Sequence, residues 1–126
     1  MQPITSTELK LLSHRQQVQF AIFCAKQVEA KWKNEPACVA AIATTEAWLE
    51  GKATEEECRK AAYNSYAISA ASWAAYAVAY TSKAAVYASN AANDAVSYVV
   101  DKQSCITAQW NYFYTLLGEL GKVLYF

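Results

Sequence analysis

Helix-breaking residues are scarce in this sequence, which contains only three glycines and two prolines. Stretches in which β-branched residues alternate with polar ones are missing as well, and that alternation is the usual pattern of a half-buried strand. The two absences exclude a protein built from sheets and tight turns, so the sequence predicts an all-α fold. A length of 126 residues predicts one domain, over residues 1–126, that is large enough to bury a core.

An excess of charge of either sign is also missing, because eleven basic and eleven acidic residues give a formal net charge of zero. General nucleic-acid binding needs a basic surface that releases counterions from the phosphates, so we expect no nucleic-acid partner. The first residues, MQPITSTELK, lack the basic and apolar regions of a secretory signal. We therefore expect a cytoplasmic protein.

Catalytic and metal-binding motifs are absent too. The four cysteines, Cys24, Cys38, Cys58 and Cys105, form no CxxC pair, and His14 is the only histidine, so we expect reduced thiols and no metal site. Glycine-rich phosphate loops and the HExxH and GxSxG motifs do not occur. We expect neither an enzyme nor a cofactor, and a surface or capping role for His14.

One long uncharged run stands out between Ala61 and Ser82, with the sequence AAYNSYAISAASWAAYAVAYTS. Its length would allow a helix to cross a bilayer, because about 20 apolar residues span the hydrocarbon core. The run is mostly alanine, serine and tyrosine, however, and each serine, asparagine or tyrosine near the bilayer centre opposes insertion. The composition therefore predicts that the run does not span a membrane.

Capping signals divide the chain into helices. Ser13 with Gln16, and Thr54 with Glu57, each have the spacing of a capping box at a helix start. The helix that starts at Ser13 is expected to continue to Trp32, since apolar residues recur along it at helical spacing. Three residues mark the start and the end of the next helix: Asn34, Pro36 and Gly51.

Helical periodicity then continues from Thr54 to about Val100. A single helix of that length would measure about 69 Å, whereas a compact chain of this size has a radius of gyration of about 14 Å. The region must therefore fold back on itself. Breaks are expected near Ser69–Ser72 and within Thr81–Asn90, where serine, threonine and asparagine side chains can cap helix ends.

Aromatic and small residues repeat within this region. Tyr66, Trp73, Tyr80 and Tyr87 fall seven residues apart. A neighbouring stripe consists of small residues: Ala67, Ala71, Ala74, Val78, Ala85, Ala88, Ala92 and Ala95. Small residues let helix axes approach closely, while the aromatic ridge supplies apolar area. We expect a compact bundle of about five to six helices with an Ala/Tyr-rich central helical hairpin.

Three segments of the chain resemble a known family: RQQVQFAIFCAKQV from Arg15, AAIATTEAWLEGKATEEECRKAA from Ala40, and the Ala-rich helices that follow. They are similar to a group of small bacterial helical proteins, the Imm-5-like immunity proteins. The shared features are an Arg before a Cys-Ala pair, a Trp-x-x-Gly helix end, an acidic helix start and an Ala pair: Arg15, Cys24, Ala25, Trp48, Gly51, Glu55–Glu57, Ala61 and Ala62. The resemblance implies a cytoplasmic protein that neutralises a partner toxin.

Two sets of residues are candidates for binding a protein partner. The first is an acidic edge on both sides of the predicted turn: Glu46, Glu50, Glu55, Glu56 and Glu57. Such an edge can steer association with a basic cleft, and the same residues can alternatively cap and solvate a pair of helices. The second set is aromatic, because interfaces are enriched in tyrosine: Tyr112, Tyr114 and Tyr125.

A possible polar cluster or pocket surrounds Asp94, which occupies the heptad step where an aromatic residue would continue the ridge. Its expected members are Tyr80, Tyr87, Asn90, Asp94 and Tyr98. A buried Asp94 carboxylate would need a hydrogen-bond or charge partner, for which Lys83 and Arg59 are candidates. The alternative is an exposed helix end.

The resemblance leads us to expect an immunity protein that binds its cognate toxin stoichiometrically and occludes it. Two alternatives stay open from the sequence. One is a phage-type protein inhibitor of a host defence complex, which would also act by binding alone. The other is a small-molecule-binding helical bundle, with a pocket around Tyr76, Tyr80, Tyr87 and Asp94.

Overall fold

A computed structural model of the chain describes residues 1–65 and 69–125, with side chains as far as Glu119. All regular secondary structure in this described part is helical, which confirms the prediction of an all-α fold. The elements are α1 (Ser6–Leu9), α2 (His14–Gln27), α3 (Glu29–Trp32), α4 (Pro36–Leu49), α5 (Glu55–Asn64), α6 (Ala70–Ala79), the 3-10 helix η1 (Thr81–Lys83), α7 (Ala84–Tyr98) and α8 (Lys102–Tyr125).

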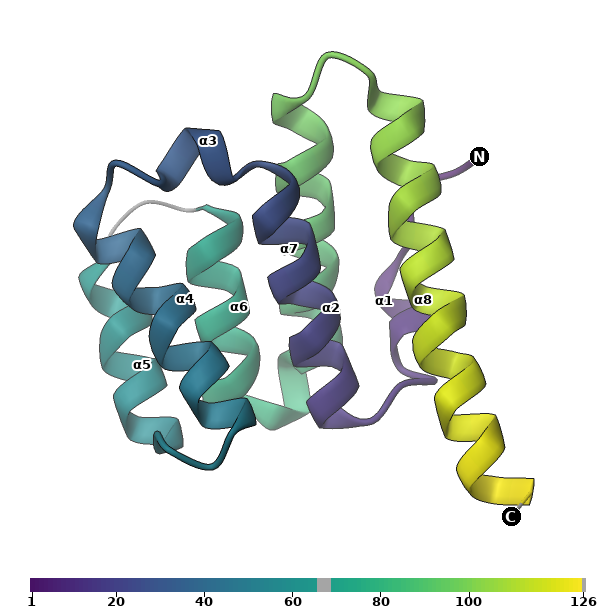
Figure 1. The fold of residues 1–126 in the computed structure, drawn as a ribbon, viewed down its shortest axis with the longest axis horizontal. Coiled ribbons are helices and arrows are strands. Elements are labelled where there is room, and N and C mark those ends of the chain that lie inside the picture. Colours follow the sequence, from purple (N-terminus) through teal and green to yellow (C-terminus); the bar gives the residue numbers. More distant parts are fainter. Residues whose placement is uncertain (66–68, 126) are drawn as a thin grey trace.

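Three helices form the centre of the molecule: α2, α6 and α7 pack against one another (Figure 1). On one side, α4 and α5 cover α6 and also pack against each other. On the other side, α8 packs on α2 and α7, and the short α1 packs on α7. This arrangement places α5 and α8 at opposite edges of the bundle (Figure 1).

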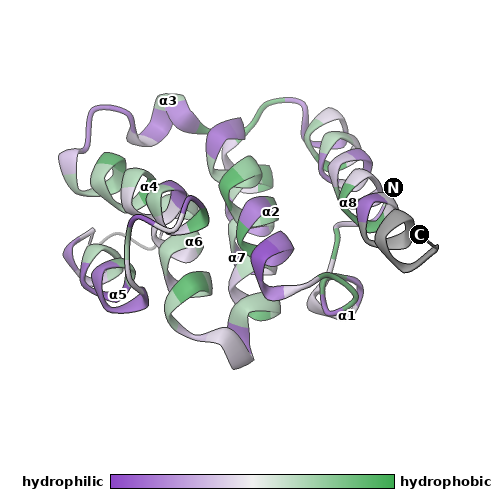
Figure 2. Cartoon of the chain, turned by 60° about the horizontal axis from the view of Figure 1, so that its bottom comes forward, coloured by the Kyte–Doolittle hydropathy of each residue, from purple (hydrophilic) through white to green (hydrophobic). Residues whose placement is uncertain are grey.

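Alanine dominates the core where α6 and α7 meet the other helices. The fully or almost fully buried alanines of these two helices are Ala70, Ala71, Ala74, Ala75, Ala77, Ala84, Ala85, Ala88, Ala91, Ala92 and Ala95. They include every described alanine of the predicted small stripe, while Ala67 lies outside the described residues. Figure 2 shows mostly hydrophobic residues along α4 and α6, both kinds along α2, and many hydrophilic residues in α3 and on α5. Small side chains thus allow close helix packing.

The two capping boxes and the helix stop at Gly51 that the sequence predicts are present. Both capping boxes form, with Ser13 and Thr54 each accepting from the backbone N–H three residues later. Gly51 follows α4 with a φ of 75°, the left-handed region that glycine adopts without a Cβ clash. The N–H groups of Gly51 and Lys52 donate to the carbonyls of Trp48 and Ala47, as in a Schellman motif.

The expectation of one helix from Ser13 to Trp32 is wrong, because the chain leaves the helical region at Val28 (φ −122°, ψ 29°). The indole N–H of Trp32 bends back and donates to the carbonyl of Ala25 at 2.8 Å, which stabilises the break between α2 and α3. Asn34 does not cap the following helix either. The N-cap of α4 is Glu35, and Pro36 is its first residue.

The total of eight helices in the described chain exceeds the expected five to six, because two of them have only four residues. No helix was expected at the position of α1, and α3 results from the break at Val28. The four-residue α1 carries the buried Leu9, so the N-terminal segment contributes to the core.

The uncharged run between Ala61 and Ser82 is divided between two helices. Its first part ends α5 at Asn64, and α6 begins after Ser69, whose hydroxyl accepts from the backbone N–H of Ser72 at 3.3 Å. The second expected break is found at η1, between α6 and α7. Within the described ranges, no helix combines the length and the apolar character that a membrane span requires.

Candidate functional site

Five aromatic side chains from α5, α6 and α7 form one continuous group on the molecular surface. This aromatic cluster consists of Tyr63, Trp73, Tyr76, Tyr80 and Tyr87. Tyr63 lies in the last turn of α5, Tyr80 caps the end of α6 and Tyr87 lies in the first turn of α7. The close packing of small residues beneath brings the three helices, and therefore these rings, together.

Tyr76 is the centre of the aromatic cluster. Its ring centroid lies 6.3 Å from that of Tyr63, 5.9 Å from that of Trp73, 6.1 Å from that of Tyr80 and 5.6 Å from that of Tyr87. Trp73 also stacks on Tyr87 at 5.5 Å with an interplanar angle of 18°. Four of the rings are half-buried and Tyr63 is 61% exposed, so the cluster is held in place and still reaches solvent.

The phenol groups of the aromatic cluster also converge. Burial raises the pKa of Tyr76 above its ordinary value, and the neighbouring phenols of Tyr63, Tyr80 and Tyr87 raise it further. The Tyr76 hydroxyl is therefore neutral near pH 7 and can both donate and accept hydrogen bonds. The cluster thus combines apolar ring area with adaptable polar groups.

A charged pair borders the aromatic cluster on α5. The Nε of Arg59 donates to Glu56 at 2.8 Å, one turn of helix away. The carboxylate of Glu56 and then the hydroxyl of Tyr80 hold the pKa of Arg59 above its ordinary value. Arg59 therefore joins the acidic start of α5 to the aromatic rings.

The structure neutralises most of the predicted acidic edge. Glu46 pairs with Lys26 at 3.0 Å, Glu50 pairs with Lys52 at 3.3 Å, and Glu56 pairs with Arg59. The Oε1 of Glu57 accepts from the backbone N–H of Thr54 at 3.0 Å, as the capping box requires. Of the five acids, Glu55 is the one with no partner among the described residues.

Tyr112 and Tyr114 lie on different faces of α8. Tyr112 stacks on Phe23 with centroids 4.5 Å apart and lines a surface hollow of about 250 Å³ together with Glu46 and Glu50. Tyr114 is 57% exposed and stacks on Trp110 instead. The structure thus brings Tyr112, but not Tyr114, to one end of the acidic edge, and the Tyr125 side chain lies outside the described ones.

The expected cluster around Asp94 is divided between two places. Tyr80 and Tyr87 belong to the aromatic cluster, and Asn90 is half-buried on α7, one turn of helix before Asp94. The partner of Asp94 is neither Lys83 nor Arg59. Its Oδ2 accepts from the backbone N–H of Ala70 at 2.8 Å, and thereby caps the start of α6.

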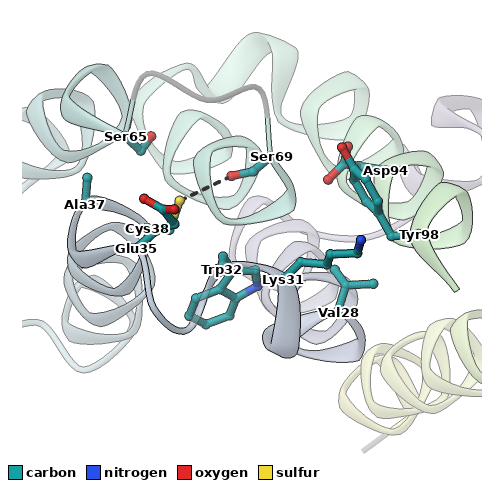
Figure 3. Close-up of a pocket in the computed structure, with 10 residues that line it drawn as sticks. All are labelled: Val28, Lys31, Trp32, Glu35, Ala37, Cys38, Ser65, Ser69, Asp94 and Tyr98. Atoms are coloured by element: carbon teal, nitrogen blue, oxygen red, sulfur yellow. Dashed lines mark hydrogen bonds between the residues drawn. The ribbon is translucent and has the colours of Figure 1, made fainter.

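Asp94 and Tyr98 instead line a cavity of about 350 Å³ between α3, α4 and α7, shown in Figure 3. Burial raises the pKa of Asp94, and the bond from Ala70 partly opposes that rise. The ammonium of Lys31 lies 4.9 Å from the centroid of the Tyr98 ring. The cavity also contains the buried side chains of Trp32 and Cys38.

The side chain of His14 is held by a hydrogen bond, and the four cysteine thiols are buried. The Nε2 of His14 donates to the carbonyl of Ala77 in the last turn of α6 at 2.8 Å. His14 thus contacts the end of another helix, while Ser13 and Gln16 cap its own. All four cysteines are free and buried. Burial raises the pKa of Cys58 to about 11, so this thiol is protonated at neutral pH. Among the side chains that the structure describes, no group of three potential ligands is placed to hold a metal ion.

Tyr63 was not expected at a functional surface from the sequence, and Arg59 was expected only as a possible partner of Asp94. Both lie on α5, whose neighbour in space could not be read from the chain. The spacing of Trp73, Tyr76 and Tyr80, at three and four residues, does carry a signal, because it places three rings on one helix face.

In comparisons with known proteins, no family model, no curated protein and no solved structure matches the chain.

Proposed function

We propose that this protein binds a partner protein stoichiometrically and neutralises it, as an immunity protein neutralises a toxin. The observation that carries the proposal is the aromatic cluster, in which five contiguous rings from three packed helices reach the surface. Tyrosine, tryptophan and arginine are the residues most enriched among interface hot spots. The resemblance of the sequence to bacterial immunity proteins adds the class of partner, a toxin met in the cytoplasm.

The arrangement of the rings in the aromatic cluster, and the charged pair beside them, are typical of a protein-binding surface. The stacked rings hold one another in place, so little side-chain entropy is lost when a partner covers them. The Arg59–Glu56 pair supplies a polar border next to the rings, and charged groups at a rim favour one orientation of the partner. Tyr112 beside Glu46 and Glu50 is a second, smaller contact candidate.

The mechanism needs no reacting group on this chain. A rigid helical surface covers the active site or cleft of the toxin, and the free energy of association alone prevents substrate access. Occlusion of this kind predicts a fixed stoichiometry, since one inhibitor molecule inactivates one partner molecule. An inhibitor of a host defence complex would use the same physics, and the chemistry of the partner distinguishes the two.

The proposal is tested by capture of the partner from the cells that encode the protein, followed by titration of the partner's own activity. We expect one protein to elute in equimolar amount and its activity to fall linearly to zero at a 1:1 ratio. A Tyr76→Ala variant, checked for native helicity, is expected to release that protein. A partner that keeps full activity at saturation, or the absence of any equimolar protein, contradicts the proposal.

A further inference from the structure

We propose that the cavity between α3, α4 and α7 binds a small organic ammonium ion, with Asp94 as its counter-charge and Tyr98 and Trp32 as aromatic walls. The inference does not depend on the proposed protein partner. The cavity volume of about 350 Å³ lies within the range of small-ligand sites. Figure 3 shows Asp94 and Tyr98 on one side of the site and Trp32 at the lower centre of the view.

Asp94 contributes to this cavity a carboxylate that has no cationic partner among the described residues. Its Oδ2 accepts the N–H of Ala70, while no hydrogen bond is found for its other oxygen within the described ranges. None of the three ion pairs in that part of the chain includes Asp94. A half-buried carboxylate without a cation gains more from an incoming ammonium than an exposed one does, because the surroundings screen the attraction less.

The aromatic wall already attracts an ammonium group. The Nζ of Lys31 lies 4.9 Å from the Tyr98 ring centroid, a distance at which the negative face of the ring stabilises a cation. Lys31 is exposed and makes no ion pair with Asp94, so it occupies the wall without neutralising the carboxylate. An organic ammonium can engage both groups, and it would compete with Lys31 for the ring.

The sign of the lining charge favours a cation over an anion. The lining contains two carboxylates, those of Asp94 and Glu35, and one ammonium, that of Lys31, so its net charge is −1. The hydroxyls of Ser65 and Ser69 also border the cavity and can accept hydrogen bonds from an N–H group. Carboxylate, aromatic faces and hydroxyl oxygens together match a primary or quaternary ammonium on a short apolar chain.

The test is a titration of the full chain with n-butylammonium and choline, with butyrate at equal ionic strength as the anionic control. We expect both cations to bind and butyrate not to bind. Binding is measured by calorimetry and by the change in the NMR chemical shift of the Trp32 indole N–H. Asp94→Asn retains an oxygen for the Ala70 N–H and removes the charge, so we expect about tenfold weaker cation binding.

Lys31→Met keeps the apolar stem and removes the competing ammonium, so we expect about threefold tighter cation binding. Opposite responses of these two variants identify the cavity as the site, since a folding defect would weaken binding in both. Equal affinity in the native chain and Asp94→Asn overturns the proposal. So does preferred binding of butyrate, or the absence of cation binding up to about 10 mM.

Discussion

Asp94 has two structural roles, because its carboxylate caps the start of α6 and also lines the cavity beside Tyr98. In this cap, the backbone N–H of Ala70 donates to the side-chain carboxylate of Asp94. Helix geometry leaves this N–H without an intrahelical partner. The cost is a charge that burial disfavours, as the raised pKa of Asp94 indicates. The two contributions can be separated by substitution.

Asp94→Ala and Asp94→Asn are expected to affect stability differently. Alanine removes the acceptor and leaves the Ala70 N–H unpaired, so we expect a loss of about 1 kcal/mol in the free energy of unfolding. Asparagine keeps an acceptor oxygen and removes the half-buried charge, so we expect a change within about 0.5 kcal/mol at pH 7. Urea denaturation measures both values, and equal losses in the two variants would contradict the capping role.

The difference in stability between the native protein and Asp94→Asn is expected to depend on pH. Since the folded chain raises the pKa of Asp94 above its ordinary value of 3.8, the folded state holds this proton more tightly than the unfolded state does. The stability of the native protein relative to Asp94→Asn is therefore greatest below pH 3.8 and falls as the pH rises through the folded pKa. A difference that grows with pH instead would mean that the carboxylate has a cationic partner.

At the scale of the elements, local signals in the sequence determine where α2, α5 and α6 begin and where α4 ends. Gly51 shows how specific such a signal is, because it ends α4 with a positive φ, whereas Gly118 lies within α8. A Cβ built at either glycine meets no atom within 4 Å. The two positions therefore differ in backbone conformation and not in available space.

Alanine substitution at these two glycines is expected to have effects of opposite sign. Gly51→Ala forces an L-residue into the left-handed region, so we expect a loss of about 1 kcal/mol. Gly118→Ala replaces glycine inside a helix and is expected to stabilise the chain by about 0.5 to 1 kcal/mol. Thermal unfolding of the two variants provides the comparison, and a stabilised Gly51→Ala would exclude the proposed helix stop.

A second prediction at this scale concerns how larger side chains in the alanine core change the free energy of unfolding. Ala88 is fully buried on α7, so Ala88→Leu must push helices apart, and we expect a loss of about 1 to 3 kcal/mol. Ala40 is exposed on α4, and Ala40→Leu adds the same atoms where space is open. Chemical denaturation should find the control within about 0.5 kcal/mol of the native chain. Similar losses in both variants would show that close packing is not the cause.

Helix positions were thus predictable wherever a residue acts on its own neighbourhood. The capping boxes at Ser13 and Thr54 and the stop at Gly51 are local and were found. The break at Val28 was not, because it is stabilised by a bond from the Trp32 indole that competes with a continuous helical pattern. Periodicity alone gave no sign of that competition.

At the scale of the whole molecule, the surfaces depend on contacts between distant parts of the chain. The Met1 amino group donates to Gln103, and the Trp110 indole donates to Gln2, across 102 and 108 positions. Tyr63 likewise joins the aromatic cluster only because α5 packs on α6. The sequence predicted the aromatic ridge as a repeat, but the cluster and the cavity beside Asp94 require the fold.

Two tyrosines of similar exposure, one inside and one outside the proposed contact surface, allow a controlled comparison. Tyr63 is 61% exposed and belongs to the aromatic cluster, whereas Tyr114 is 57% exposed on α8, at the opposite edge of the bundle. Each ring packs against a neighbouring aromatic residue. Truncation of either tyrosine removes the same atoms from equally exposed positions, so a difference in partner binding reflects the location of the surface.

The measurement that tests the proposed surface most directly is the dissociation constant of the captured partner for Tyr63→Ala and Tyr114→Ala, with helicity as the folding control. We expect Tyr63→Ala to raise the dissociation constant at least about tenfold, as the loss of a hot-spot ring does, and Tyr114→Ala to leave it unchanged. The reverse result, with binding lost only in Tyr114→Ala, would place the interface on α8 and contradict the role of the aromatic cluster.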